Sequence, residues 1–457
     1  MNKKTIYFGT DGIRGRANSK KMNAELALRI GMASAKVFTR GEHRHHVLIG
    51  KDTRLSNYTI EPALVAGFLS MGMNVYLTGP LPTPGVAALV SSMRCDLGIM
   101  ISASHNEHID NGIKIFGPGG NKLSDIEELE IEKFIDMKNR ILVNPEKLGR
   151  AKRIDDAGGR YIEYLKSKIY RHLKLDGLKI VIDCANGAAY KVAPTILWEL
   201  GAKVYPINVK PDGTNVNKDC GSTNPKKLIQ KVLEHKADIG IALDGDADRC
   251  LIIDEKGQII DGDKILALIG IDWKKGNKLI NNTIVGTVMT NKGLENFLNK
   301  NDILLTRTQV GDRNIIMEMQ KENIVLGGEP SGHIILNHYS STGDGLLAAL
   351  EVLAIMKKQK SLLSSLTNLY KPYPQVLKNF ELKKNQNPEE IIHAIQASLN
   401  KHDYNMMKDS RMILRKSGTE NKIRLMVEAS NSQIANQMID KANEVFIEKC
   451  KKKNFLH

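Results

Sequence analysis

The stretch Ile239-Gly-Ile-Ala-Leu-Asp-Gly-Asp-Ala-Asp-Arg249 joins an apolar run to three acidic residues at every second position. The run Ile239–Leu243 predicts a buried strand, so Asp244, Asp246 and Asp248 follow where that strand ends. Alternation along an extended chain would point the three side chains to one side. Three like charges this close repel one another unless a cation neutralises them, and carboxylate oxygens suit Mg²⁺ or Ca²⁺. The stretch therefore predicts a divalent-cation site, with an acidic surface turn as the alternative.

An EF-hand calcium loop has a similar spacing, because Asp would occupy its positions one, three and five and Glu255 its position twelve. Position six is Arg249, where that loop needs glycine for a sharp turn. The following segment, Cys250–Ile253, predicts another strand rather than a helix. The sequence therefore argues against an EF-hand.

Strand-like and helix-like segments alternate in three rounds through most of the chain. Such alternation predicts α/β layers with right-handed crossovers, and three similar rounds predict three related domains. The expected strands are 47–50, 74–77, 97–101, 178–183, 203–207, 239–243, 284–288 and 303–306. The expected helices are near 57–72, from about 84, and near 188–200, 225–235, 292–299 and 312–321.

The chain beyond about residue 370 predicts a smaller α+β domain. Its expected strands are 376–380, 411–415 and 423–428, and its expected helices are near 388–400 and from about 431. We therefore place the domains at 1–152, 153–256, 257–370 and 371–457.

The composition is that of an ordinary globular protein of 457 residues, with 42% hydrophobic and 26% charged residues. A net charge of +15 could favour nucleic acid or an anionic ligand, yet only 5% of residues are aromatic, so platforms for base stacking are scarce. No apolar run of about 18 residues appears, so we expect no membrane span. Five widely separated cysteines indicate the reducing cytoplasm rather than a disulfide framework. The cluster of His43, His45 and His46 favours a surface loop over a metal site.

The loop Ile101-Ser-Ala-Ser-His-Asn106 ends an expected strand and places Ser104 beside His105, with Lys114 nearby. A serine in this position can form a simple turn hydrogen bond. A phosphoryl-accepting nucleophile would have the same surroundings. The metal site favours the second interpretation, because phosphoryl transfer needs Mg²⁺ to neutralise charge on the moving group.

Two further loops carry polar side chains. Gly327-Gly-Glu-Pro-Ser-Gly-His333 gathers an acid, a hydroxyl and an imidazole, and short polar side chains of this kind bind sugar hydroxyls. A plain hairpin loop is the alternative. Arg415-Lys-Ser-Gly-Thr-Glu420, with Arg424 beyond it, suits a phosphate cradle, and its alternative is a turn between two strands.

Six motifs, in the same order and over nearly the whole chain, resemble the signatures of the α-D-phosphohexomutase family. They are Tyr7-Phe-Gly-Thr-Asp-Gly-Ile-Arg-Gly15, Ile101–Asn106, Asp244–Arg249, Gly286-Thr-Val-Met-Thr-Asn291, Gly327–His333 and Arg415–Glu420. The first and fifth are more similar to the glucosamine branch of the family than to its phosphomannomutase or phosphoglucomutase branch. The resemblance implies three α/β domains with mixed sheets and a C-terminal α+β domain around a central cleft.

The resemblance also implies a role for each candidate residue. Ser104 would be the phosphoserine, and its phosphate with Asp244, Asp246 and Asp248 would hold one Mg²⁺ per chain. Arg249 would lie beside the transferring phosphoryl group. The other residues divide into groups for proton transfer and charge neutralisation (Arg14, Lys114, His333), for sugar hydroxyls (Glu329, Ser331) and for the phosphate that does not react (Arg415, Ser417, Gly418, Thr419, Arg424).

The implied reaction interconverts glucosamine 6-phosphate and glucosamine 1-phosphate, which feeds UDP-N-acetylglucosamine and cell-wall precursor synthesis. Phospho-Ser104 would give its phosphoryl group to the sugar, the 1,6-bisphosphate would turn around, and the other phosphate would return to the serine. Glucosamine or glucose 1,6-bisphosphate would act as an activator. The family suggests a homodimer, and the positive charge would serve a small sugar phosphate rather than nucleic acid or a membrane.

Two positions depart from the family pattern. Glu107 stands where proline usually follows His-Asn, and Asn421 stands where proline usually follows Thr-Glu. Because proline stiffens a loop, we expect both loops to be more mobile and turnover to be lower. Glu107 also brings negative charge toward the phosphoserine unless it points away or meets a lysine. A metal-binding relative with weakened catalysis therefore stays open, as does another sugar specificity within the family.

Overall fold

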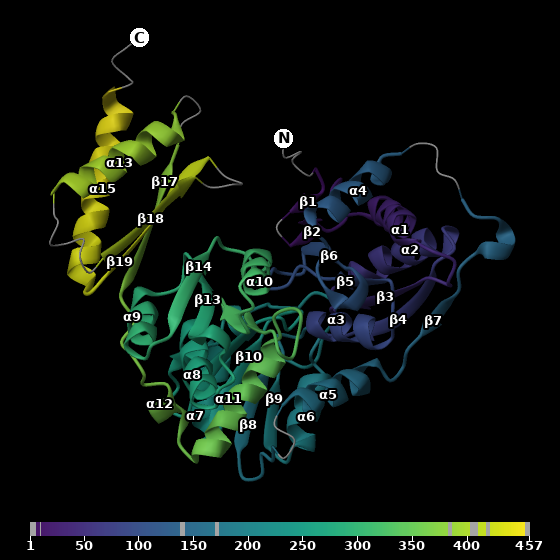
Figure 1. Cartoon of the computed structure of the whole chain (residues 1–457), viewed down its shortest axis with the longest axis horizontal. Helices are drawn as coiled ribbons and strands as arrows, with labels where there is room; N and C mark the ends of the chain where they lie inside the picture. The colour runs from purple at the N-terminus through teal and green to yellow at the C-terminus, as the bar shows by residue number, and fades with distance from the viewer. Residues whose placement is uncertain are drawn as a thin grey trace. The chain divides into compact units, whose positions relative to one another are not determined.

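The computed structural model of the chain describes residues 6–9, 11–137, 142–169, 173–382, 386–402, 410–416 and 421–452. Packing divides the chain into two compact units. The first comprises 1–289 and 301–369, and the second comprises 290–300 and 370–457. Three sheets lie in the first unit and a fourth in the second (Figure 1). Within the described residues, no helix is both long and apolar enough to cross a membrane.

The first sheet has seven strands in the order β1-β2-β6-β5-β3-β4-β7. Its strands are β1 (Phe8–Gly9), β2 (Gly12–Arg16), β3 (His46–Lys51), β4 (Asn74–Pro80), β5 (Leu97–Ile101), β6 (Asp110–Phe116) and β7 (Ala151–Arg153). β3 pairs in parallel with β4 and β5, whereas β6 runs antiparallel between β5 and β2, so the sheet is mixed. The loop that contains Ser104 follows the carboxyl end of β5.

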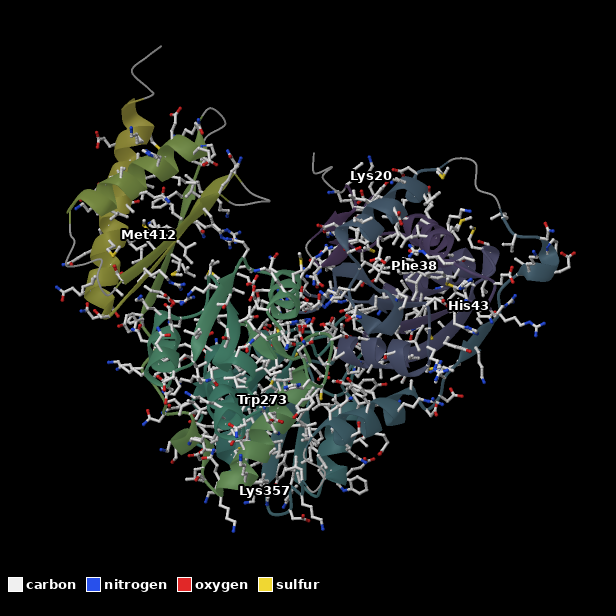
Figure 2. All side chains as sticks on the ribbon, in the orientation of Figure 1. Lys20, Phe38, His43, Trp273, Lys357 and Met412 are labelled. Atoms are coloured by element: carbon white, nitrogen blue, oxygen red, sulfur yellow. The ribbon has the colours of Figure 1, made fainter. Side chains whose placement is uncertain are left out.

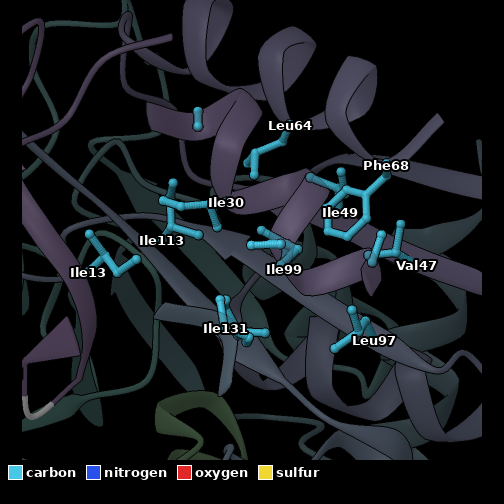
Figure 3. Close-up of a cluster of buried hydrophobic side chains, with 14 of the residues drawn as sticks. Ile13, Ile30, Val47, Ile49, Leu64, Phe68, Leu97, Ile99, Ile113 and Ile131 are labelled. Atoms are coloured by element: carbon cyan, nitrogen blue, oxygen red, sulfur yellow. The ribbon is translucent and has the colours of Figure 1, made fainter. Parts of the chain in front are cut away.

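Helices cover both faces of the seven-stranded sheet. They are α1 (Ala24–Phe38), α2 (Asn57–Ser70), α3 (Thr83–Ser92) and α4 (Asp125–Ile135). Side chains alternate along each strand, so β3 turns Val47 and Ile49 toward α1 and α2, while Gly50 meets Val86 of α3. The resulting core includes Ile13, Ile30, Val47, Ile49, Leu64, Phe68, Leu97, Ile99, Ile113 and Ile131 (Figure 3).

The second sheet has five strands in the order β12-β11-β10-β8-β9. Its elements are β8 (Lys179–Asp183), β9 (Lys203–Ile207), β10 (Ile239–Leu243), β11 (Cys250–Asp254) and β12 (Ile259–Ile260), with α5 (Ala157–Lys168), α6 (Val192–Glu199) and α7 (Lys226–His235). Every residue of β10 is buried, which explains its unbroken apolar run. β11 returns antiparallel to β10, so the acidic loop joins two strands and is not an EF-hand.

The third sheet has four strands in the order β14-β13-β15-β16. Its elements are β13 (Thr283–Thr287), β14 (Leu304–Thr308), β15 (Leu326–Gly328) and β16 (Ile334–Leu336), with α8 (Gly262–Lys275), α10 (Asp312–Lys321), α11 (Gly345–Gln359) and α12 (Leu363–Leu366). Trp273 of α8 is fully buried, and its indole nitrogen donates a 2.6 Å hydrogen bond to Glu351 of α11 (Figure 2). This bond ties two helices of the domain together.

The second unit holds an antiparallel sheet in the order β17-β19-β18. Its elements are α9 (Lys292–Lys300), β17 (Gln375–Glu381), α13 (Pro388–His402), β18 (Ser410–Lys416), β19 (Lys422–Ala429) and α15 (Ser432–Lys452). Ile423, Leu425 and Val427 of β19 pack against apolar residues of α13 and α15. By alternation, Arg424 lies on the sheet face away from these helices.

The predicted strands and helices are present, with ends that differ by a few residues. The antiparallel strand β6 and helices α1, α4, α5, α8 and α11 are among the elements that were not predicted. The boundaries proposed at 152, 256 and 370 stay a prediction.

Candidate active site

Ser104 lies in the loop after β5 and is only 1% exposed. Its backbone has a φ of +52°, a left-handed conformation that costs a non-glycine residue on the order of 1 kcal/mol. The surroundings hold this conformation, because the Ser104 amide donates a 2.9 Å hydrogen bond to Ser102 Oγ. Ser102 Oγ in turn donates to Asp52 Oδ2 at 2.7 Å. The loop therefore presents the Ser104 hydroxyl in a fixed direction.

Two polar side chains hold the serine loop through its backbone. The guanidinium of the buried Arg54 donates to four carbonyls of the loop, those of Ser104, Asn106, Glu107 and Asp110. Its Nε also donates to Asp52 Oδ2 at 2.7 Å, so its charge is paired. Asn217, which follows β9, donates 2.8 Å hydrogen bonds to the carbonyls of Ser104 and Asn106. The Glu107 side chain is exposed to solvent.

The Ser104 hydroxyl donates a 2.7 Å hydrogen bond to Asp244 Oδ2, which joins the loop after β5 to the loop after β10. Close approach requires a glycine here, because a Cβ at Gly245 would lie 2.7 Å from the Ser104 carbonyl oxygen. The predicted alternation of the three aspartates is wrong. The chain turns at once after β10, with Ala247 at a φ of +57°, and this turn rather than an extended strand gathers the carboxylates.

The carboxylates of Asp244, Asp246 and Asp248 form a buried oxygen cluster, in which one oxygen from each lies within 4.8 Å of the others. Burial and the charges of Asp248 and Asp246 hold the pKa of Asp244 well above its ordinary value. Among the described residues, Oδ1 of Asp246 and Oδ1 of Asp248 are buried without a hydrogen-bond partner. Hard oxygen donors, crowded negative charge and two unpartnered oxygens fit a divalent cation such as Mg²⁺.

Lys114 of β6 reaches this cluster from the first sheet. Its Nζ lies 2.8 Å from Asp246 Oδ2, 2.9 Å from Asp248 Oδ2 and 3.2 Å from Asp11 Oδ2. Burial disfavours the charged form of Lys114, but Asp11, Asp246 and Asp248 hold its pKa well above the ordinary value. Lys114 therefore stays a cation at neutral pH.

Two arginines and a histidine lie around the serine and the cluster. Arg14 of β2 donates to Asp11 and remains partly exposed. The backbone N–H of Arg249 donates to Asp244 Oδ1 at 3.2 Å, and its Nε lies 3.9 Å from Asp248. Burial, together with the positive charges of Arg249 and Arg14, lowers the pKa of His105 to about 4, so this imidazole is neutral at pH 7.

The hairpin between β15 and β16 brings the predicted sugar loop to the same cluster. His333 Nδ1 lies 3.7 Å from Asp248 Oδ1. Burial lowers the pKa of this imidazole, but Asp248 raises it by more, so the pKa lies above its ordinary value. Glu329 accepts a 3.0 Å hydrogen bond from the Gly311 amide, and Ser331 Oγ donates to Glu329 at 3.3 Å.

Gly332 locks this hairpin onto β11. The Cys250 amide donates a 2.9 Å hydrogen bond to the Gly332 carbonyl, and a Cβ at Gly332 would lie 2.0 Å from the Cys250 carbonyl oxygen. Gly332 also has a φ of +88°, so another residue here would be strained as well as crowded. The structure thus brings together Ser104, the three aspartates, Lys114, Arg14, Arg249 and His333, with Glu329 and Ser331 on the same hairpin as His333.

The predicted phosphate residues lie in the second unit. Arg415 and Arg424 are exposed and stand directly opposite each other on β18 and β19. Guanidinium groups are strong phosphate ligands, so these two residues remain candidates for an anion site. The predicted residues Ser417, Gly418 and Thr419 lie outside the described residues. Asn421 exchanges two hydrogen bonds with the backbone of Leu382, at 2.8 and 2.9 Å.

Four protein-family descriptions match successive parts of the chain. They are phosphoglucomutase/phosphomannomutase alpha/beta/alpha domain I (residues 5–140), domain II (159–257), domain III (261–373) and the C-terminal domain (377–445). The chain belongs to the phosphoglucomutase/phosphomannomutase family. This membership confirms the predicted fold class of three α/β domains and a smaller C-terminal domain.

Relatives in this family are more than 50% identical in sequence to the chain. A protein of Zymomonas mobilis subsp. mobilis named phosphoglucosamine mutase is 54% identical over 434 residues, covering 95% of this chain and 97% of that protein. A phosphoglucosamine mutase of Parvibaculum lavamentivorans is 53% identical over 437 residues, with coverage of 95% and 97%.

Solved structures of the family share the fold at lower identity. A phosphoglucomutase/phosphomannomutase family protein from Burkholderia thailandensis has a TM-score of 0.80 at 24% identity over 97% of both chains. The N-acetylphosphoglucosamine mutase of Aspergillus fumigatus, in complex with GlcNAc-6P and magnesium, has a TM-score of 0.66 at 16% identity. That alignment covers 98% of this chain and 96% of the other.

Several residues of the candidate active site were not predicted from the sequence. Asp11 pairs with Lys114 and also with Lys122, which reaches on to Asp312 beside His333. Thr83 donates its hydroxyl to Asp246 Oδ2. Asp11 lies within the quoted opening motif, so that motif was a usable signal. Arg54, Asn217 and Thr83 act through long-range contacts that no local spacing reveals.

Proposed function

We propose that the chain is a phosphoglucosamine mutase that interconverts glucosamine 6-phosphate and glucosamine 1-phosphate through phosphorylated Ser104. The observation that carries this proposal is the 2.7 Å hydrogen bond from Ser104 to Asp244 within a buried carboxylate cluster. This contact supports the proposal, because phosphoryl transfer needs a hydroxyl nucleophile close to a cation. Relatives that carry this name over nearly the full chain support the choice of sugar.

The carboxylates of Asp244, Asp246 and Asp248 would hold Mg²⁺ together with the phosphate on Ser104. Bound Mg²⁺ neutralises charge on the phosphoryl group as that group moves. Lys114 and Arg14 add positive charge at the same place, and Lys114 stays protonated because of its acidic neighbours. We assign these two residues to charge neutralisation rather than to accepting a proton.

In the first half-reaction, the free C1 hydroxyl oxygen of glucosamine 6-phosphate attacks phosphorus, and the bond between phosphorus and Ser104 Oγ breaks. The proton of the sugar hydroxyl passes to a side chain, and a proton returns to Ser104 Oγ. His105 is neutral and its Nδ1 lies 3.5 Å from Ser104 Oγ, so it can receive and return a proton there. His333 is the candidate on the sugar side, because it shares its hairpin with Glu329 and Ser331.

The second half-reaction needs the 1,6-bisphosphate to present its other phosphate to Ser104. Glu329 and Ser331 would bind sugar hydroxyls in either orientation, since both offer short, adaptable hydrogen bonds. Arg415 and Arg424, with Ser417, Gly418 and Thr419, would hold whichever phosphate does not react. Glucosamine or glucose 1,6-bisphosphate would serve as the activator that first phosphorylates the serine. A cytoplasmic homodimer stays a prediction, and light scattering of the purified protein tests the dimer.

Turnover with glucosamine, glucose and mannose 6-phosphates, each with Mg²⁺ and a trace of 1,6-bisphosphate, tests the proposal. We expect glucosamine 6-phosphate to give the highest kcat/KM, by roughly tenfold or more, which corresponds to about 1.4 kcal/mol of transition-state binding. Higher kcat/KM for glucose or mannose 6-phosphate would assign the chain to another branch of the family. No turnover with any of the three would indicate a metal-binding relative without catalysis.

A further inference from the structure

A second cluster of ligand-type side chains lies at the amino ends of β3 and β5 in the seven-stranded sheet. His45 directly precedes β3, and Asp96 directly precedes β5, which pairs with β3 in parallel. His43 lies in the preceding loop, at the outer side of the first domain (Figure 2). Ser104 follows the other end of β5, and five strand residues at about 3.3 Å each separate the two ends. The cluster is therefore distinct from the active site.

One carboxylate oxygen faces two imidazole nitrogens in this cluster. Asp96 Oδ1 lies 2.8 Å from His43 Nε2 and 3.2 Å from His45 Nδ1. The two imidazole rings are themselves close, with centroids 4.1 Å apart. Two ligands bound at about 2.0–2.1 Å to a tetrahedral Zn²⁺ lie roughly 3.4 Å apart. The observed separations are near this value. A small cation could therefore replace the protons that lie between Asp96 and the two imidazoles, with little movement of the side chains.

The backbone holds Asp96 in the orientation that a ligand needs. Its Oδ2 accepts a 2.8 Å hydrogen bond from the His46 amide, which leaves Oδ1 directed at the histidines. The Asp96 amide donates a 2.9 Å hydrogen bond to the His46 carbonyl. Outer hydrogen bonds of this kind orient the carboxylates of metal sites.

Burial differs across the cluster in a way that suits ion entry. His45 is only 5% exposed, so packing holds its imidazole in place with Nδ1 toward Asp96. The His43 side chain is 60% exposed and leaves a path for an ion and for a water as the fourth ligand. The set of two imidazoles and one carboxylate suits Zn²⁺, whereas Mg²⁺ prefers oxygen ligands.

We propose that His43, His45 and Asp96 form a second metal site that binds Zn²⁺ with a water as the fourth ligand. Bound Zn²⁺ would link the loop before β3 to the loop before β5 and would stabilise the first domain. The site stands apart from the mutase chemistry, so it would affect thermal stability rather than turnover.

Titration of the full chain with Zn²⁺ in excess Mg²⁺ tests the proposal, because Mg²⁺ then occupies the acidic cluster. X-ray absorption at the zinc edge identifies the ligands. We expect one Zn²⁺ per chain with scattering from two imidazoles, and a higher melting temperature with Zn²⁺ than without it. H43A and D96N should each weaken Zn²⁺ binding by about tenfold or more.

H393A is the matched control, because His393 is exposed on α13, and it should bind Zn²⁺ like the unchanged protein. H43A should keep its mutase turnover and its melting temperature without Zn²⁺, which separates loss of binding from loss of folding. D246N should keep the imidazole-bound Zn²⁺. Unchanged Zn²⁺ affinity in both H43A and D96N, or a zinc-edge spectrum without imidazole, would overturn the proposal.

Discussion

Asp244 accepts a 2.7 Å hydrogen bond from the Ser104 hydroxyl, although 140 positions separate the two residues. The contact exists because β5 and β10 end in loops that meet, and because Gly245 and the left-handed Ser104 allow close approach. It joins the Ser104 hydroxyl to the buried carboxylate cluster. The account of the reaction depends on this contact.

The acidic cluster should determine the metal dependence of turnover. D246N removes one charge and one of the two unpartnered oxygens, so we expect Mg²⁺ affinity to fall by about 10- to 100-fold. Chelation should abolish turnover of the unchanged protein, and added Mg²⁺ should restore it. D272N is the control, because Asp272 pairs with Lys358 outside this cluster. Turnover of D246N against Mg²⁺ concentration checks this, and an unchanged curve would contradict it.

Asn217 should position the serine loop without touching substrate. N217A removes two hydrogen bonds to loop carbonyls, worth about 1 kcal/mol each, so we expect kcat to fall by roughly tenfold while KM changes little. N215A is the matched control, because the Asn215 side chain bonds to Lys210 and Asp212 of its own loop. Steady-state kinetics distinguish the two variants, and equal kcat values would speak against a positioning role.

The missing proline at Glu107 should matter less than the sequence predicted. Arg54 and Asn217 already fix the loop carbonyls, and the Glu107 side chain is exposed, so its charge is screened by water. We therefore expect E107P to change kcat by less than about threefold, because a loop held by a few kcal/mol of hydrogen bonds gains little from a proline. A tenfold gain in kcat in E107P would instead support a mobile loop, provided that the serine loop exchanges hydrogen faster with Glu107 than with proline.

Asp344 should make stability depend on pH. It is buried at the start of α11, and burial raises its pKa from 3.8 to about 6 despite hydrogen bonds from Leu347 and Tyr161. The folded state then holds a proton that the unfolded state has lost, so this residue lowers stability as pH rises from about 4 to about 6. Asparagine keeps the helix cap without the charge.

We expect D344N to gain stability over the unchanged protein through this pH window, by at most about 3 kcal/mol, and to keep that gain at higher pH. Urea unfolding of both proteins at several pH values checks the difference. A gain that shrinks as pH rises would contradict the assignment.

Local patterns predicted much of the fold and the centre of the site. The apolar run of β10 and the acidic residues after it were visible because both depend on neighbouring residues. The roles of Arg54 and Asp96 were not predicted, because each contacts groups that only the assembled sheet brings near. The turn at Ala247 was missed for a related reason, since a left-handed alanine has no sequence signature.

The most direct test follows a labelled phosphoryl group from a 1,6-bisphosphate onto the protein and then onto glucosamine 6-phosphate. The account predicts that peptide mass spectrometry finds the label on Ser104 and that the substrate removes it. It also predicts that S104A takes no label and loses about 1,000-fold or more in turnover, or about 4 kcal/mol of transition-state stabilisation. Label on another residue, or full turnover by S104A, would contradict the account.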